Sequence, residues 1–186
     1  AMNLAVIMEL PLVVIDVQRG GPATGLPTKS EQTDLLQCLF GRNGETPMPV
    51  IAATSPADCF ESAYAACKIA LEHMTPVVLL TDAFIANGSG AFRLPNLAEY
   101  AAINPPYVPE ELKGSWTPYQ RQEENGVRYW AVPGREGFQH ILGGLEKDNK
   151  TGAISTDPEN HDLMTRLRQQ KIDAIPVPDL EVEGDK

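Results

Sequence analysis

Residues 16–29 combine the side chains and the backbone freedom that an anion-binding loop needs. The segment reads DVQRGGPATGLPTK, and its side-chain donors include Arg19, Thr24, Thr28 and Lys29. An arginine guanidinium binds a carboxylate or a phosphate through two parallel hydrogen bonds. The three glycines permit tight turns and let the backbone approach a ligand closely. These residue types are typical of a site for a small anion.

The same spacing also fits a rigid connecting loop with a surface arginine. Loops with glycine and proline are common, and this segment is neither a phosphate-binding P-loop nor a GxGxxG motif. The position of the segment favours a binding role, because it follows a predicted strand and open α/β sheets bind ligands at the carboxyl ends of their strands. Asp16, at the end of that strand, is interpreted as a structural acceptor for the backbone amides of the loop.

One cysteine could carry nucleophilic chemistry. Cys59 lies near the start of a predicted helix, a position that can activate a thiol. The segments VVIDVQ and CFESAYAACKIALEHMTPVVLLTDAF are also similar to isochorismatase-like cysteine hydrolases. Asp16 and Cys59 are too close in sequence for that fold, and no helix–strand unit carrying a lysine separates them. We therefore interpret Cys59 as a half-buried small residue.

Apolar runs predict a parallel sheet flanked by helices, which is an α/β fold. The runs at 12–15, 49–53 and 77–80 are continuous rather than alternating, as in strands that are covered on both faces. A helix is predicted between the second and third runs, with Ser55 as its N-cap and Pro56 in its first turn. Its predicted inner face consists of Ala63, Ala66, Cys67, Ala70 and Leu71.

Two more helices are predicted outside this unit. Residues 3–10 read as the last turns of a helix, so the domain is expected to be truncated at its N-terminus, and Glu9 is expected at the surface. A helix over 158–174 should begin after the N-cap Asp157. Its expected apolar stripe is Leu163, Leu167 and Ile172.

The remaining segments carry weak periodicity. We expect a single domain over 1–186, with a loop-rich excursion at 87–150 and a linker-like tail at 176–186. The aromatic residues of the excursion are expected to pack at a protein interface. They are Trp116, Tyr119, Tyr129 and Trp130.

The composition excludes several kinds of partner and site. The chain has 15 basic and 25 acidic residues, and the net charge of −10 argues against nucleic acid as a partner. Three cysteines without a CxxC pair and three scattered histidines predict neither disulfides nor a metal or iron–sulfur site in this chain. The apolar runs are strand-sized and no secretion signal is present, so we expect a cytoplasmic protein that does not contact a membrane.

Three motifs, in order along the chain, resemble one enzyme family. LPLVVIDVQRGGPATGLPTKSEQTDLLQ is similar to a stretch in the alpha subunits of 2-oxoacid:ferredoxin oxidoreductases, particularly of the 2-oxoglutarate type. SPADCFESAYAACKIALEHMTPVVLLTDAFIANGSG and TDPENHDLMTRLRQQKID resemble later segments of the same subunit. The resemblance implies part of the pyrimidine-binding domain of a thiamine-diphosphate enzyme.

The resemblance assigns roles within the first motif. The arginine that grips the carboxylate of the 2-oxoacid in the family corresponds to Arg19, and the threonine of the substrate pocket corresponds to Thr28. The loop residues expected to shape the pocket are Gly20, Gly21, Thr24 and Gly25. No catalytic or metal-binding residue is assigned to this chain.

The resemblance also implies a reaction with several partners. The complete enzyme would oxidatively decarboxylate a 2-oxoacid with coenzyme A, giving an acyl-CoA, carbon dioxide and reduced ferredoxin. A beta subunit would hold most of the thiamine diphosphate and its magnesium ion, other subunits would hold the iron–sulfur clusters, and gamma and delta subunits are possible further partners.

The family's cofactor-activating glutamate and its tyrosine-proline-isoleucine-threonine-proline motif do not occur in this chain. The isolated chain is therefore expected to be inactive. A non-catalytic structural subunit of the same complex is the alternative that the sequence leaves open.

Overall fold

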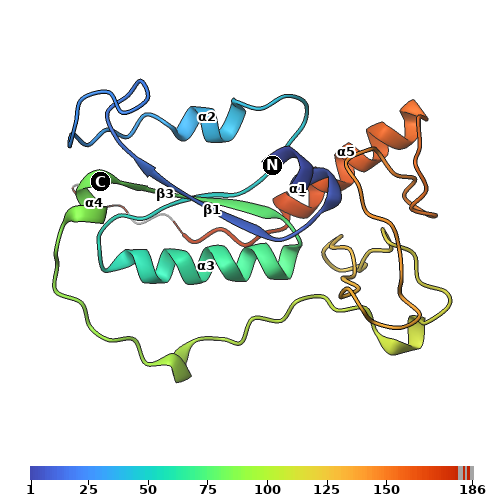
Figure 1. Cartoon of the computed structure of the whole chain (residues 1–186). Helices are drawn as coiled ribbons and strands as arrows, with labels where there is room; N and C mark the ends of the chain where they lie inside the picture. Colours follow the sequence, from blue (N-terminus) through green and yellow to red (C-terminus); the bar gives the residue numbers. More distant parts are fainter. Residues whose placement is uncertain (180–181, 183, 185–186) are drawn as a thin grey trace.

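Three parallel strands form the centre of the structure (Figure 1). The computed structural model describes residues 1–179, 182 and 184. Strands β1 (Leu12–Gln18), β3 (Pro76–Asp82) and β2 (Val50–Ala52) lie side by side in that order. β3 is therefore paired on both edges, and all seven of its residues are buried. The predicted parallel sheet is confirmed.

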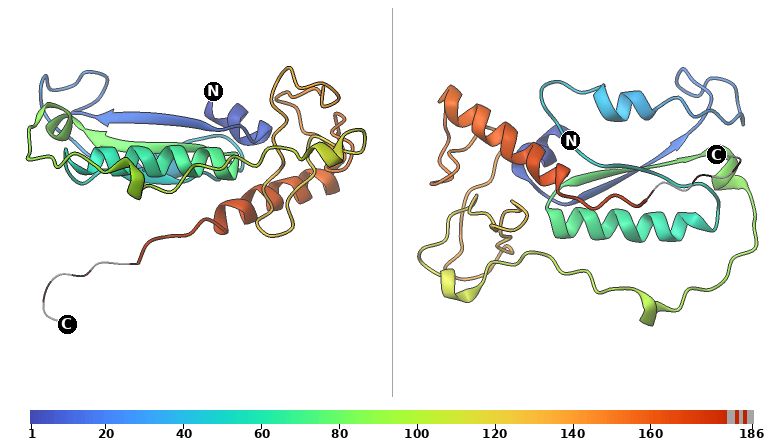
Figure 2. Two further views of the ribbon diagram at one scale, coloured as in Figure 1. Left: turned by 90° about the horizontal axis from the view of Figure 1, so that it is seen from below. Right: turned by 180° about the vertical axis from the view of Figure 1, so that it is seen from behind.

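Helices cover both faces of the sheet, and alternate residues of β3 serve the two sides. Val78 and Leu80 join Cys38 of α2 (Leu35–Phe40) in one apolar cluster. Val77 joins Ala66 and Ala70 of α3 (Asp58–His73) in another. Successive side chains of a strand point to opposite faces, so this division follows from the strand geometry. Figure 2 shows α3 lying along one face of the sheet.

Helix α3 begins two residues later than its proline predicts. Pro56 and Ala57 form a turn, and the amide of Asp58 donates to the Ser55 hydroxyl at 3.1 Å. Ser55 thus caps the turn that leads into the helix. The prediction for Cys67 was wrong, since this side chain is exposed. The buried residues of α3 recur every fourth position, at Ser62, Ala66 and Ala70, and position 67 lies about 100° around the helix from that line.

A long segment with little regular structure joins α4 (Ala83–Asn87) to the last helix. It contains two 3₁₀ turns, Leu97–Glu99 and Glu110–Leu112. Its first part runs along the outer side of α3, as Figure 2 shows, and the rings of Tyr64 and Tyr100 meet there at 4.9 Å between centroids.

The aromatic residues of the excursion pack against one another rather than forming a free surface. Tyr119 is only 2% exposed, and Trp116 contacts Phe138 edge-on at 5.9 Å between ring centroids. Trp116 and Tyr129 also pack against the small apolar core of Val108, Ala131 and Phe138. The expectation of an aromatic interface was therefore wrong for Tyr119, which is buried inside the excursion. For the half-buried Trp116, Tyr129 and Trp130 it stays a prediction.

Helices α1 (Met2–Met8) and α5 (Pro158–Asp173) lie at the amino ends of the strands, together with the folded part of the excursion (Figure 1). The predicted cap of α5 is confirmed, because the Asp157 carboxylate accepts from the amide of Glu159 at 3.1 Å. The predicted apolar stripe was wrong. The side chains that α5 buries are Asn160, Met164, Arg168 and Lys171.

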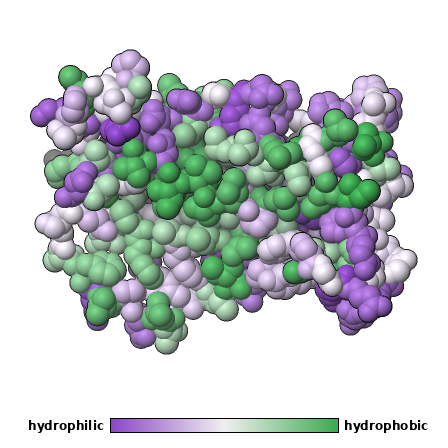
Figure 3. All heavy atoms as spheres, in the orientation of Figure 1, coloured by the Kyte–Doolittle hydropathy of each residue, from purple (hydrophilic) through white to green (hydrophobic). Residues whose placement is uncertain are grey.

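Strand β1 is an edge strand in this chain and is less buried than its sequence predicts. Ile15, the last residue of the continuous apolar run, is 59% exposed, and Val17, which follows Asp16 in the same strand, is 46% exposed. On the face of the molecule that Figure 1 shows, hydrophobic residues gather across the middle, where β1 runs (Figure 3). Pairing on one edge only leaves this strand partly uncovered.

Candidate functional site

The loop at 19–33 leaves the carboxyl end of β1, at the end of the sheet opposite to α1 and α5 (Figure 1). Gln18, the last residue of β1, lies opposite Asp82, the last residue of β3. Two loops therefore leave the sheet side by side. Ligands of open α/β sheets bind at this end of the strands, so the site predicted from sequence lies at the expected place in the fold.

The loop folds back on itself through its own backbone. The amide of Gly20 donates to the carbonyl of Lys29 at 2.9 Å and closes the neck of the loop. Ala23, Gly25 and Thr28 have φ values of 55°, 41° and 62°, in the left-handed region. A side chain at position 25 would also collide with the carbonyl oxygen of Gly20, so only glycine fits there.

Polar side chains at the ends of β1 and β3 hold the two ends of the loop, which we call its feet: residues 18–19 and 32–34. The Gln18 side chain, 6% exposed, accepts from the amide of Asp34 at 3.0 Å and donates to the carbonyl of Thr81 at 3.3 Å. The Gln32 side chain donates to the Asp82 carboxylate at 2.6 Å. The pKa of Asp82 is lowered by hydrogen bonds, first from the amide of Ile85 and then from Gln32.

A cavity of about 330 Å³ lies at this end of the sheet. It is lined by both glutamines, by the ends of β2 and β3 and by the apolar side chains of Leu35, Leu80 and Ile85. The Thr81 hydroxyl, on the same wall, is buried and has no hydrogen-bond partner among the residues that the structure describes. The cavity therefore combines apolar walls with amide and hydroxyl groups and the Asp82 carboxylate.

The residues predicted to bind the substrate lie on the loop above this cavity, not in its wall. Arg19, Thr24 and Thr28 are all exposed. The Thr28 hydroxyl donates to the carbonyl of Pro27 at 2.6 Å. No hydrogen bond or ion pair joins the Arg19 side chain to any described residue. The sequence did not predict a role for Gln18 or Gln32, although Gln18 directly precedes Arg19 in the motif.

The expectation that Asp16 holds the amides of the loop was wrong. Gln18 and Glu31 accept from such amides instead, and the Asp16 carboxylate lies 4.0 Å from the Cys38 thiol. Burial, together with the nearby Asp34, raises the pKa of Asp16. The interpretation of Cys59 as half-buried agrees with the structure.

The expectation of a surface position for Glu9 was also wrong. Its side chain is fully buried at the end of α1, where Lys171 donates to it at 2.6 Å and Arg121 pairs with both of its oxygens. Burial alone would raise the pKa of Glu9, but the two cations more than offset that effect and hold it well below its usual range. Burial lowers the pKa of Lys171 to about 8.

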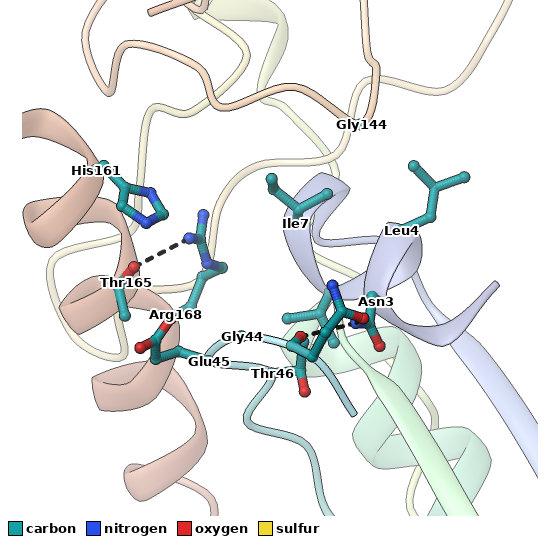
Figure 4. A pocket seen from close by; sticks show the side chains of 12 residues that line it. Asn3, Leu4, Ile7, Gly44, Glu45, Thr46, Gly144, His161, Thr165 and Arg168 are labelled. Carbon is teal, nitrogen blue, oxygen red and sulfur yellow. Dashed lines mark hydrogen bonds between the residues drawn. The ribbon is translucent and has the colours of Figure 1, made fainter. Parts of the chain in front are cut away.

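A second cavity, of about 460 Å³, lies at the amino ends of the strands (Figure 4). Asn3, Leu4 and Ile7 of α1 form one wall, and His161 and Arg168 of α5 form another. The His161 ring and the Arg168 guanidinium both contact Glu146, at 2.7 and 3.0 Å. This cavity and the loop at 19–33 lie at opposite ends of the strands, so they are separate features.

Comparison with known proteins identifies the family. Residues 1–160 match the family described as "Pyruvate flavodoxin/ferredoxin oxidoreductase, thiamine diP-bdg". The chain belongs to this family. The resemblance found in the sequence is thereby confirmed, and so is the thiamine-diphosphate type of fold.

Relatives from this oxidoreductase family match nearly the whole chain. The 2-oxoglutarate oxidoreductase subunit KorA of Mycobacterium tuberculosis is 55% identical over 98% of this chain, and the match covers 28% of the relative. The 2-oxoglutarate synthase subunit KorA of Methanothermobacter marburgensis is 29% identical over 92% of the chain and 44% of its own length.

A solved structure has the same fold. The 2-oxoglutarate:ferredoxin oxidoreductase from Magnetococcus marinus, with 2-oxoglutarate, coenzyme A and succinyl-CoA bound, superposes with a TM-score of 0.88 at 33% identity. The match covers all of this chain and 32% of that chain. The chain thus spans less than half the length of the relatives that it matches.

The described residues contain neither a side-chain cluster for a metal ion nor a helix that could span a membrane. No group of three or more histidine, cysteine, aspartate or glutamate side chains is placed to bind a metal ion in that part of the chain. Likewise, no helix among those residues is long and apolar enough to cross a membrane.

Proposed function

We propose that this chain is part of the alpha subunit of a thiamine-diphosphate-dependent 2-oxoglutarate:ferredoxin oxidoreductase. The complete enzyme oxidatively decarboxylates 2-oxoglutarate with coenzyme A to an acyl-CoA and carbon dioxide, and it passes two electrons to ferredoxin. Family membership, the KorA relatives and the ligands named for the Magnetococcus marinus structure support this proposal. Free cysteines and the absence of a membrane-spanning helix in the described residues are compatible with a cytoplasmic enzyme.

The observation that carries the proposal is an unpaired positive charge at the mouth of the sheet. Among the described lysines and arginines, side chains without a hydrogen bond or an ion pair are found only at Arg19, Lys29, Arg93 and Lys150. Two of these four, Arg19 and Lys29, belong to the same loop, and the residue after Arg19 is tied to Lys29 by the backbone hydrogen bond from Gly20 to Lys29. In a chain of net charge −10, this location favours an anionic ligand.

In the proposed mechanism the chain binds and orients the substrate. The Arg19 guanidinium holds the carboxylate of the 2-oxoacid through two hydrogen bonds, and Thr28 borders the substrate on the same loop. The nucleophilic carbon that attacks the substrate carbonyl is supplied by thiamine diphosphate when it is bound. Fixing the carboxylate keeps the carbonyl carbon in reach of that nucleophile and removes much of the entropic cost of the addition.

The described residues do not provide a site for the diphosphate and the magnesium ion of thiamine diphosphate. The described residues offer no acidic cluster for a magnesium ion, and the cavity beside β2 and β3 is lined mainly by apolar and amide groups. We therefore assign the diphosphate and its magnesium ion mainly to the beta subunit, and the iron–sulfur clusters to other subunits or partners.

The test is to express the complete alpha and beta chains together and to follow 2-oxoacid-dependent viologen reduction. Replacing Arg19 by alanine should lower kcat/KM for 2-oxoglutarate by roughly 10²-fold or more, which corresponds to about 3 kcal/mol for the loss of the two charge-assisted hydrogen bonds to the substrate carboxylate. Arg93→Ala is the matched control, because Arg93 is also exposed and unpaired among the described residues.

Equal activity of the Arg19→Ala and Arg93→Ala enzymes would remove Arg19 from the mechanism. A wild-type complex that reduces viologen without any dependence on a 2-oxoacid would refute the proposed function as a whole. It would leave the non-catalytic structural subunit as the better interpretation.

A further inference from the structure

We propose that Gln18, Gln32 and Asp82 are positioning residues that hold the substrate loop at 19–33 in its binding conformation. This inference rests on the proposed function, since it assigns the loop the task of binding a 2-oxoacid. It concerns residues that do not themselves touch the substrate. They act through Arg19 and Thr28.

The three side chains form a clamp at the feet of the loop. Gln18 stands just before the loop, and its side-chain carbonyl accepts from the amide of Asp34, just after the loop, at 3.0 Å. One side chain thereby joins both feet. Gln32 adds a second tie through its 2.6 Å hydrogen bond to Asp82 at the end of β3.

The clamp is anchored in the rigid part of the protein. Gln18 and Asp82 are 6% and 3% exposed, and they end β1 and β3, two strands that are paired along their whole length. Asp82 is itself fixed, because its second oxygen accepts from the amide of Ile85 at 2.9 Å in the first turn of α4. A hydrogen bond to a buried carboxylate is stronger than one between neutral groups.

The loop has few other ties to the sheet. Its residues are exposed apart from Gly20. Among the residues that the structure describes, its remaining hydrogen bonds are internal: Gly20 to Lys29, Gly21 to Glu31, Gly25 to Pro22, Lys29 to Leu26 and Thr28 to Pro27. These bonds fix the shape of the loop but not its position on the sheet. Its position therefore depends on the clamp.

A misplaced loop would cost substrate binding rather than folding. If the feet are released, Arg19 and Thr28 sample many positions and must be ordered each time a substrate binds, which weakens the binding. Groups that hold reacting partners in place contribute to catalysis even when they lie away from the reacting atoms. The clamp should thus affect the 2-oxoacid and leave coenzyme A binding alone.

The experiment compares the same substitution at two positions in the complete oxidoreductase with its partner subunits. Gln32→Met keeps the length of the side chain and removes its donor, and because Gln32 is exposed we expect this variant to fold. Gln37→Met on α2 is the control, because Gln37 is also exposed and its side chain makes no hydrogen bond to the described residues. Gln18→Met tests the buried half of the clamp.

For Gln32→Met we expect the KM for 2-oxoglutarate to rise about tenfold, with little change in kcat or in the KM for coenzyme A. Hydrogen exchange of peptides covering 19–34, measured without substrate, should become faster. Gln18→Met should shift both readouts in the same direction. Gln37→Met should match the wild type in both.

The clamp is overturned if Gln32→Met leaves both hydrogen exchange and KM unchanged. It is also overturned if exchange becomes faster while the KM for 2-oxoglutarate stays the same, or if the KM for coenzyme A rises equally. A failure of the proposed function is recognised separately, because the wild type would then show no 2-oxoacid-dependent reduction. In that case the exchange comparison alone still decides whether these residues hold the loop.

Discussion

Glu9 illustrates how a single buried carboxylate can join segments that are far apart in the sequence. Its side chain contacts Lys171 of α5 and Arg121 of the excursion, and its backbone carbonyl accepts from the Arg128 side chain at 3.1 Å. Lys171 also donates to the carbonyl of Met74 at the end of α3, at 2.9 Å. The carboxylate is therefore a centre around which α1, α3, α5 and the excursion meet.

Replacing Glu9 by glutamine should destabilise the protein by about 3 kcal/mol, because it leaves Lys171 and Arg121 as buried cations without their counter-charge. The free energy of unfolding in urea measures this effect. Asp162→Asn is the control: it removes the partner of Arg166 in an exposed ion pair on α5 and should change stability very little. Similar decreases in the free energy of unfolding for both variants would show that the buried ion pairs of Glu9 stabilise the fold no more than an exposed pair does.

The lowered pKa of Glu9 makes the stability of the fold depend on pH in the acidic range. The folded state holds the pKa of Glu9 below the value of 4.5 that it has when unfolded. Its contribution is therefore complete above about pH 4.5 and is lost as the pH falls towards the folded-state pKa. Thermal melts between pH 7 and pH 3 should show a smaller loss of stability for Glu9→Gln than for the wild type.

At the scale of elements, the loop at 19–33 depends on one glycine more than on the others. Gly25 combines a positive φ of 41° with a close approach to the carbonyl of Gly20, whereas a Cβ added at Gly21 would meet nothing within 4 Å. The motif contains three glycines, but only the folded loop shows which of them is sterically required.

Gly25→Ala should distort the loop, since alanine at this position is strained and collides with the main chain. We expect kcat/KM for 2-oxoglutarate in the complete enzyme to fall at least tenfold, with the melting temperature lowered by a few degrees. Gly90→Ala is the matched control, because its added Cβ would meet nothing within 4 Å and its φ is not positive. A Gly25→Ala enzyme with wild-type kinetics would contradict the steric argument.

At the scale of the whole molecule, β1 remains an open edge. An apolar edge strand with exposed backbone groups tends to pair with other chains. β1 has this character over seven residues, and Ile15 and Val17 are exposed along it.

Ile15→Lys should reduce self-association of the isolated chain several-fold, because a charged side chain on an edge strand opposes pairing. Light scattering at increasing protein concentration measures this change. Phe84→Lys is the control for a general loss of apolar surface, since Phe84 is 72% exposed but lies on α4 and not on a strand. An equal effect of both substitutions would mean that the strand edge is not the site of association.

Short-range features of the sequence were sufficient for much of this protein. The three strands follow from continuous apolar runs, and the cap at Asp157 and the βαβ unit around α3 follow from local signals of a few residues. The family follows from the motif around Arg19, because the letters of a motif do not depend on how the rest of the chain packs. Each of these features is decided within one segment.

The tertiary structure alone decided features that depend on which distant residues meet. Glu9 is buried because Lys171, 162 positions later, reaches it. The face of α5 that carries Arg168 and Lys171 is buried in place of the leucines because their charges find partners inside. Gln18 holds the loop because β1 and β3 end side by side. Local periodicity carries no information on such contacts, since their energies arise only when separate segments come together.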